Sequence, residues 1–193
     1  MLAACSVNKL QETITTVDTA NVVADLMMSR RSIRAYKDST VSRETLNEIL
    51  KCGINAPNGK NLQSYEIRVI DFPALIDSIT KAVVKDNPKI AERDGFRNIF
   101  VNAPCVVCIA YDTQYDMAQV DCGLLGENII LAAWAKGIGS CCLGSSHAGF
   151  SIRLQQSLIS TEWHSPRATN CFTALPSAIQ MKRQRQNQDV RIR

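Results

Sequence analysis

One long apolar segment, Met117 to Lys136, limits the possible folds of this chain more than any other feature. It has the length of a helix, and Gly137 is placed as the residue that stops it. A helix that is apolar on most faces normally lies at the centre of a domain. Because Glu127 stands inside this segment, where an unpaired carboxylate would be costly, we expect it to have a partner. Polar residues interrupt the apolar runs, so no membrane span is predicted.

Shorter segments also have the spacing of helices or strands. Apolar residues recur at helical intervals in residues 18–28 and 72–84, and Ser42 opens another helix that ends near Gly53 and Pro57. Two further segments, residues 65–70 and 104–111, have the patterns of an alternating strand and a buried strand. No internal repeat precedes residue 150. The sequence therefore predicts one α+β domain, with helices packed around a modest sheet.

The charge of the chain is concentrated near its end. The 193 residues carry a net charge of +4 and are 46% hydrophobic, which is typical of a globular domain. Six of the 22 basic residues but only two of the 18 acidic ones lie in residues 160–193, so 16 of each remain before that segment. Residues 1–159 therefore carry no net charge, and we expect no nucleic-acid partner.

The eight cysteines show no regular disulfide spacing. Cys105 and Cys108 form a C-x-x-C motif, but in a strand their side chains would face opposite sides. We therefore predict that most of the cysteines are buried free thiols, and we predict no metal site.

The N-terminal segment, residues 1–16, contains a different clue. A Leu-Ala-Ala-Cys box ends at Cys5, as at the end of a bacterial lipoprotein signal, but the charged and apolar regions that should precede it are absent. The chain as written is predicted to be cytoplasmic. The alternative is a cell-envelope lipoprotein anchored at Cys5, with a true start upstream.

Three motifs follow one another through the first 150 residues. Arg30 to Tyr36 reads RRSIRAY, whose guanidinium groups suit a phosphate, although charge alone also fits a solvated helix end. Ala56 to Gln63 reads APNGKNLQ, which permits close approach of backbone to a ligand or forms an ordinary turn. Gly137 to Gly144 reads GIGSCCLG; helix termination explains Gly137 but not the later glycines.

Together these motifs resemble the nitroreductase family, from about Leu26 to about Phe150. The resemblance implies a nitroreductase-like α+β fold with a central, mostly antiparallel sheet flanked by helices, in an obligate homodimer. It divides the chain into the N-terminal segment, a nitroreductase-like domain of residues 17–150 and an aberrant basic tail of residues 151–193. The family usually has Pro and Trp where this chain has Ser64 and Tyr65, so a stiffening proline is missing from the loop.

The resemblance also implies a bound flavin mononucleotide (FMN), with NADH or NADPH as reductant. The first motif would hold the phosphate and the polar edge of the ring. The second, which in the family comes from the other subunit, would lie over the ring, and backbone amides of the third would face flavin N5. The implied cofactor-binding residues are Arg30, Arg31, Ser32, Arg34, Pro57, Asn58, Gly59, Asn61, Gln63, Leu143 and Gly144. The flavin supplies the chemistry, so no catalytic side chain is implied.

The implied activity is an oxidoreductase reaction in two halves. NAD(P)H gives a hydride to flavin N5, and a nitroaromatic or quinone-like acceptor then takes the electrons from the same face. Two alternatives stay open: a flavin-binding or storage module without turnover, and an inactive product of a frameshifted gene.

The tail is the reason for the last alternative. Residues 161–193 are rich in Gln, Arg, Ser and Asn without apolar periodicity, which is typical of a disordered tail and predicts no strand. When residues 163–189 are back-translated and each codon's third base starts the next codon, they permit the peptide AFPEGYELLYCIAIGYPDEAPAAKPR. This peptide resembles the family's C-terminus. We therefore hypothesise a frameshift between about Ile152 and Thr161, which would remove a strand and a phosphate-binding Lys/Arg.

Overall fold

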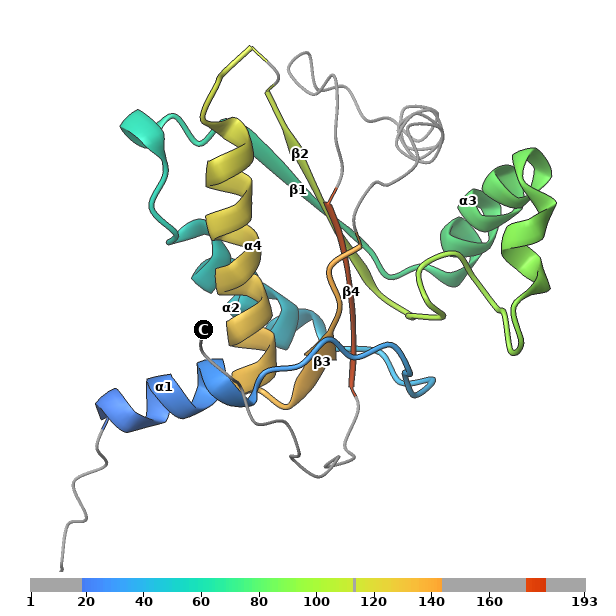
Figure 1. Cartoon of the computed structure of the whole chain (residues 1–193), viewed down its shortest axis with the longest axis horizontal. Coiled ribbons are helices and arrows are strands. Elements are labelled where there is room, and N and C mark those ends of the chain that lie inside the picture. Colours follow the sequence, from blue (N-terminus) through green and yellow to red (C-terminus); the bar gives the residue numbers. More distant parts are fainter. Residues whose placement is uncertain (1–18, 113, 144–172, 180–193) are drawn as a thin grey trace, which may run out of the picture.

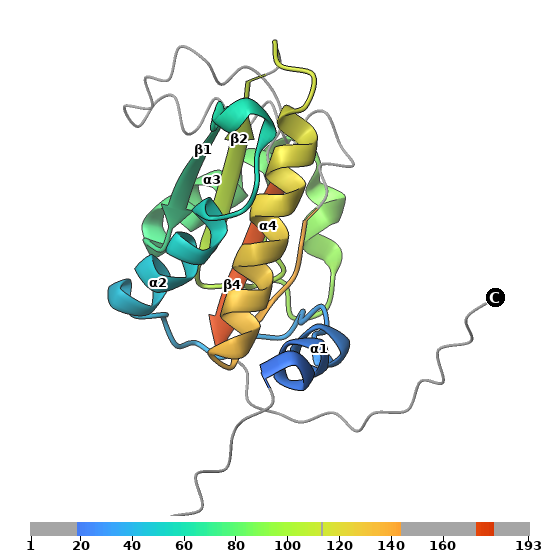
Figure 2. The same cartoon turned by 90° about the vertical axis from the view of Figure 1, so that its left-hand side faces the viewer.

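The computed structural model describes residues 19–112, 114–143 and 173–179, which form a small sheet with helices on both faces (Figures 1 and 2). Cys5, Gly144 and most of the tail lie outside these residues. The helices are α1 (Thr19–Ser29), α2 (Arg43–Ile54), α3 (Pro73–Asp86) and α4 (Ala118–Ala135), with short 3-10 helices η1 (Gly59–Asn61) and η2 (Pro88–Glu92). The strands are β1 (Tyr65–Ile70), β2 (Val106–Tyr111), β3 (Ile138–Ser140) and β4 (Thr173–Ile179).

The ends of two predicted helices are confirmed by their caps. The hydroxyl of Ser42 accepts a hydrogen bond from the backbone N–H of Thr45 at 3.2 Å and so begins α2. Gly137 ends α4 with a φ of +73°, and its N–H donates to the carbonyl of Trp134 at 2.9 Å. A left-handed residue at this place is the usual stop of a helix.

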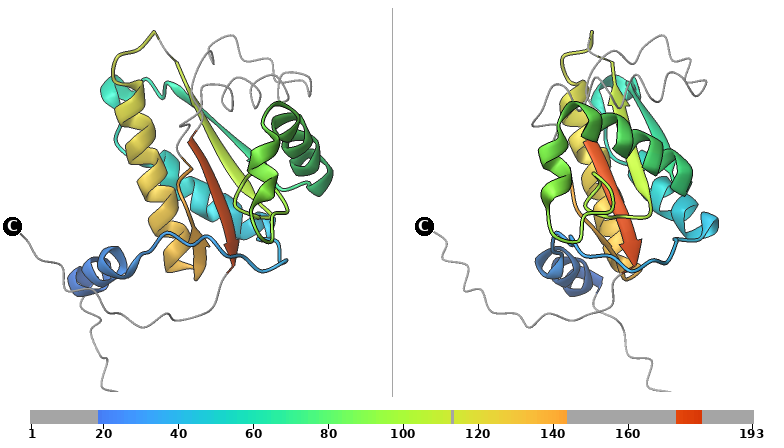
Figure 3. Two further views of the ribbon diagram at one scale, coloured as in Figure 1. Left: turned by 45° about the vertical axis from the view of Figure 1, so that its right-hand side comes forward. Right: turned by 90° about the vertical axis from the view of Figure 1, so that its right-hand side faces the viewer.

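The sheet has the order β1-β2-β4-β3, and every neighbouring pair is antiparallel. β1 and β2 pair along their whole length, from Tyr65 opposite Tyr111 to Ile70 opposite Val106. The first half of β4 pairs with β2, and its second half pairs with β3 (Figure 3). β4 therefore joins β3 to the rest of the sheet.

β4 corrects the prediction that the tail contains no strand. Five of the six residues of β2 are buried, and β1 pairs with only one of its edges. The backbone N–H and C=O groups on the second edge need partners because water cannot reach them. β4 supplies these partners opposite residues 106–109. The demand comes from the tertiary structure, so the composition of the tail gave no signal of it.

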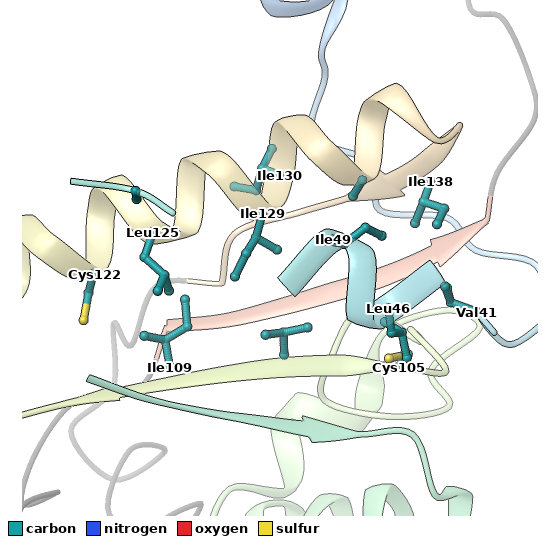
Figure 4. Packing of buried hydrophobic residues seen from close by; sticks show 13 residues of the cluster. Val41, Leu46, Ile49, Cys105, Ile109, Cys122, Leu125, Ile129, Ile130 and Ile138 are labelled. Carbon is teal, nitrogen blue, oxygen red and sulfur yellow. The ribbon is translucent and has the colours of Figure 1, made fainter. Parts of the chain in front are cut away.

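The core has two parts, one on each face of β2. Cys105, Val107 and Ile109 contribute to a cluster with α2 and α4, which Figure 4 shows. Cys108, on the opposite face, belongs to a second cluster with residues of α3 and Phe100. The two cysteines of the C-x-x-C motif therefore face opposite sides, as predicted. No described group of three or more metal-ligating side chains could hold an ion.

Helix α4 is central, as predicted, and packs very closely on α2. A Cβ atom on Gly53 would lie 2.5 Å from Cγ1 of Ile129, so only glycine fits between these two helices. Glu127 is exposed on α4, contrary to its expected place among apolar residues, and it forms no salt bridge with another described residue. Among the described residues, no helix has both the length and the apolar character needed to cross a bilayer.

Two sets of large apolar side chains are exposed in the part of the chain that the structure describes. On α1, whose helical spacing was predicted correctly, the exposed residues are Val22, Val23, Met27 and Met28. At the start of α4 they are Met117, Val120 and Leu124. We call these two sets the apolar surface of α1 and the apolar surface of α4.

Candidate functional site

The first and third motifs lie side by side. Ser32 forms a parallel bridge with Ser140 of β3, and the N–H of Ile33 donates to the carbonyl of Ser140 at 2.9 Å. The segment Arg30–Tyr36 is thereby fixed along β3, beside residues 140–143. We call this arrangement the basic half-site. It unites the predicted residues Arg30, Arg31, Ser32, Arg34 and Leu143.

The three arginines of the basic half-site have different surroundings. Nη1 of Arg31 donates to the carbonyls of Met28 and Arg30, each at 2.7 Å, and so satisfies carbonyl groups at the end of α1. Arg30 is half-buried and Arg34 is exposed, and neither forms a salt bridge with another described residue. Arg30 and Arg34, with the exposed hydroxyl of Ser32, therefore offer donors to an anion.

Tyr36 and Leu143 anchor the basic half-site in the protein. Both are half-buried and pack against the second core cluster. The hydroxyl of Tyr36 donates to the carbonyl of Ile33 at 2.5 Å. Burial raises the pKa of Tyr36 above its ordinary value, and the nearby Cys141 raises it further. The phenol stays protonated at neutral pH and acts as a support for the segment.

Gly139 has a packing role that the sequence did not reveal. A Cβ atom at this position would lie 2.7 Å from Cγ1 of Ile33 and 2.9 Å from its Cβ. Glycine is therefore needed so that the segment Arg30–Tyr36 can approach β3.

We expect Gly139→Ala to destabilise the protein by about 1 to 3 kcal/mol, the usual cost of overpacking. The collision involves the stem of Ile33, which cannot rotate away. Urea unfolding measures this change. Ile33→Ala should be less costly in the Gly139→Ala background than in the wild type. Additive effects of the two substitutions would contradict the contact.

The second motif forms an exposed loop at the opposite end of α4. Asn58 and Gly59 are half-buried, whereas Pro57, Asn61 and Gln63 are exposed. A hydrogen bond from the N–H of Gly59 to Oδ1 of Asp121, at 2.9 Å, ties the loop to α4. We call residues 57–63 the loop half-site.

Helix α4 separates the two half-sites within a protomer. Asp121 contacts the loop half-site near the start of α4, and Trp134 donates from Nε1 to Oγ of Ser29 at 3.0 Å near its end. These two residues lie about 20 Å apart along the axis, since each residue adds about 1.5 Å. Figure 1 shows the start and end of α4 at opposite sides of the domain. Within one protomer, therefore, the two half-sites are too far apart to contact the same ring of a bound ligand.

The buried thiols of Cys105 and Cys108 are not part of the site. Burial raises the pKa of Cys105 to about 12 and that of Cys108 to about 12, so both stay protonated and unreactive in the folded chain. Cys52 and Cys142 are exposed, although burial of its thiol also raises the pKa of Cys142.

Thiol labelling at pH 8 should therefore modify Cys52 readily and leave Cys105 and Cys108 unmodified until the chain unfolds. Peptide mass mapping identifies the labelled sites.

The raised pKa values of Cys105 and Cys108 also make the free energy of unfolding depend on pH, because unfolded thiols ionise near pH 8.5 and these folded ones only near 12. We expect this contribution to be complete below about pH 8.5 and to be lost as the pH rises towards 12. Fast native labelling of Cys108 would contradict the burial.

Comparisons with solved structures show the fold class. The chain superposes on an FMN-dependent nitroreductase from Clostridium difficile with a TM-score of 0.72 at 24% identity, covering 90% of this chain and 97% of that one. A nitroreductase with bound FMN from Desulfitobacterium hafniense gives a TM-score of 0.67 at 24% identity, covering 86% and 94%. The chain thus has the α+β fold that these proteins share.

The sequence comparisons show the family. The model of the nitroreductase family matches residues 27–158, and the chain belongs to this family. An NADH dehydrogenase/NAD(P)H nitroreductase of Archaeoglobus fulgidus is 32% identical over 124 residues, 62% of this chain and 65% of that protein. An NADPH-dependent oxidoreductase of Staphylococcus haemolyticus is 28% identical over 140 residues, 65% of this chain and 54% of that protein. The chain spans less than two thirds of the length of these relatives.

Proposed function

We propose that the chain is a flavin-dependent oxidoreductase that passes a hydride from NADH or NADPH, through FMN, to a nitroaromatic or quinone-like acceptor. The observation that carries this proposal is the basic half-site, where Ser32 docks on Ser140 and places Arg30 and Arg34 beside residues 140–143. Membership of the nitroreductase family supports it.

The donors of the basic half-site fit a flavin phosphate. Arg30, Arg34 and Ser32 would bind the phosphate and the polar edge of the ring, and backbone amides after Ser140 would face N5. FMN, when bound, accepts a hydride and donates it again. The loop half-site of a second protomer would cover the ring, where Leu62, 51% exposed in the single protomer, would exclude water.

We propose that the chain acts as a homodimer with the flavin between the protomers. The separation of the half-sites along α4 supports a site that is shared by two copies. The apolar surfaces of α1 and α4 supply an interface, because large apolar side chains gathered on a monomer usually mark a contact surface. Each site would then combine the basic half-site of one copy with the loop half-site of the other.

The first test is the visible absorption spectrum of the purified chain after FMN is added and the protein is desalted. Retained flavin, followed by oxidation of NADH or NADPH with a quinone or nitro acceptor, is the expected result. Retained flavin without turnover would favour the storage module. A colourless protein would contradict both and favour the inactive product.

The second test asks whether the site is shared. A variant with Arg30→Glu and Arg34→Glu loses the basic half-site, and a variant with Asn61→Ala and Gln63→Ala loses the loop half-site. We expect each variant alone to be nearly inactive. Mixing them with subunit exchange should restore about a quarter of the wild-type activity, because half of the dimers then contain one intact site. No recovery in a mixture that forms dimers would contradict a shared site.

We also propose that the tail arose by a frameshift between about Ile152 and Thr161. The segment CIAIGY of the alternative peptide coincides with residues 173–179, the residues of β4. In the alternative frame, an apolar segment rich in strand-forming residues would therefore occupy the position of β4. The coding DNA decides the question: codons incompatible with the alternative frame would disprove it.

A further inference from the structure

The backbone of the loop half-site is strained. Lys60, Asn61 and Gln63 have φ angles of 55°, 53° and 48°, in the left-handed region that L-residues rarely adopt. Three such residues among four neighbours persist only where the surroundings hold them in place. The loop must therefore be restrained by contacts that outweigh its own preference.

The restraints come from within the loop and from α4. Inside the loop, the N–H of Gln63 donates to Oδ1 of Asn58 at 3.0 Å, and the N–H of Leu62 donates to the carbonyl of Gly59 at 3.1 Å. From α4, Oδ1 of Asp121 accepts from the N–H of Gly59 at 2.9 Å. This bond joins residues 62 positions apart and ties the loop to the central helix.

Gly59 is held on a second side as well. A Cβ atom on Gly59 would lie 2.1 Å from the hydroxyl oxygen of Tyr115 and 3.6 Å from Cβ of Met117. The backbone at Gly59 is thus enclosed between the Asp121 carboxylate and the segment that leads into α4. Gly59 is the fixed point of the loop, and the strained residues Lys60, Asn61 and Gln63 follow it in the chain.

Asp121 is an unusual residue to find in this place. Its side chain is only 2% exposed, and among the described residues its Oδ2 has no hydrogen-bond partner. Burying a carboxylate with one unsatisfied oxygen is unfavourable, although the start of a helix favours a negative charge. The described hydrogen bond that the carboxylate accepts at this buried position is the one from the N–H of Gly59, which gives the carboxylate a role in holding the loop.

We infer that Asp121 is a positioning residue of the flavin site. It holds Gly59 so that the exposed side chains of Asn61 and Gln63 project from the protomer towards the flavin of the second copy. This inference rests on the proposed function, because the loop half-site has a ligand to cover only if FMN is bound between two protomers.

The first experiment measures the loop without flavin. Trypsin cleavage after Lys60 is followed in the wild type, Asp121→Ala, Asp121→Asn and Leu125→Ala. Leu125, one turn further along α4 and fully buried, provides a control that lowers stability without removing a hydrogen bond to the loop. We expect cleavage at Lys60 to be at least about tenfold faster in Asp121→Ala than in Leu125→Ala, compared at equal unfolding free energy. Asn keeps the acceptor oxygen, so Asp121→Asn should restore most of the protection.

The second experiment measures FMN. We expect about a tenfold weaker affinity in Asp121→Ala, the loss of one charge-assisted hydrogen bond, with near wild-type affinity in Asp121→Asn and in Leu125→Ala. Equal losses in Asp121→Ala and Leu125→Ala would show an effect of stability alone and would overturn the inference. Normal FMN binding with unchanged cleavage in Asp121→Ala would overturn it while leaving the proposed function intact. A wild type that binds no FMN would overturn the proposed function, and the role of Asp121 with it.

Discussion

Ending the chain after Phe172 is expected to abolish cooperative folding, whereas ending it after Ile179 is expected to preserve it. The first truncation removes β4, so four positions of β2 and all three of β3 lose the strand that pairs with them. An unsatisfied buried backbone group costs about 1 to 3 kcal/mol. Summed over the backbone groups of β2 that lose a partner, this cost approaches the free energy of unfolding of a typical domain, about 5 to 15 kcal/mol.

The two truncations form a matched pair, because the second removes only residues 180–193 and leaves the sheet whole. Thermal unfolding followed by circular dichroism should give a sigmoidal transition for the longer chain and none for the shorter one. Equal transitions would show that β4 contributes nothing to the sheet. Loss of folding in both chains would instead place the essential residues beyond Ile179.

The second large effect is expected at the basic half-site. Arg34→Ala should weaken FMN binding about tenfold to a hundredfold, because a charge-assisted hydrogen bond to phosphate contributes about 1.5 to 3 kcal/mol. Arg34 is exposed and forms no salt bridge with another described residue, so its loss should barely change stability. Fluorescence titration of FMN measures the affinity, and urea unfolding measures the stability.

Lys37→Ala is the control for this prediction. Lys37 is also exposed and lies in the same segment, so its loss removes an equal charge without removing a predicted contact. We expect at most a small change in FMN affinity for Lys37→Ala. If the two variants weaken binding equally, long-range electrostatics accounts for the effect and Arg34 makes no specific contact.

Local sequence signals were sufficient for most of the fold. The alternation of residues 65–70 predicted β1 with its observed bounds, and Ser42 marked the start of α2. β4 could not be predicted in this way, because the open edge of β2 creates the need for it. The exposure of the apolar surface of α1 could not be predicted either, since helical spacing shows which residues share a face but not what covers that face.

The motifs predicted which residues could form the site, but not how they are supported. The resemblance implied that the first and third motifs surround one flavin, and the bridge from Ser32 to Ser140 places these two segments side by side. The packing of Ile33 on Gly139 requires a contact across 106 positions, which periodicity does not report. Asp121 was missed because an acidic residue in the first turn of a helix is common for electrostatic reasons alone.

The pairing of β2 with β4 has a consequence for the order of synthesis. β2 leaves the ribosome more than sixty residues before β4, a delay of about 3 to 13 s at the usual rates of translation. During that time an apolar strand has an unpaired edge, which is the kind of surface that pairs with other chains. The nascent protein therefore depends on residues 173–179, which are made late, to close its sheet. Conditions that slow translation should increase aggregation before they affect the finished domain.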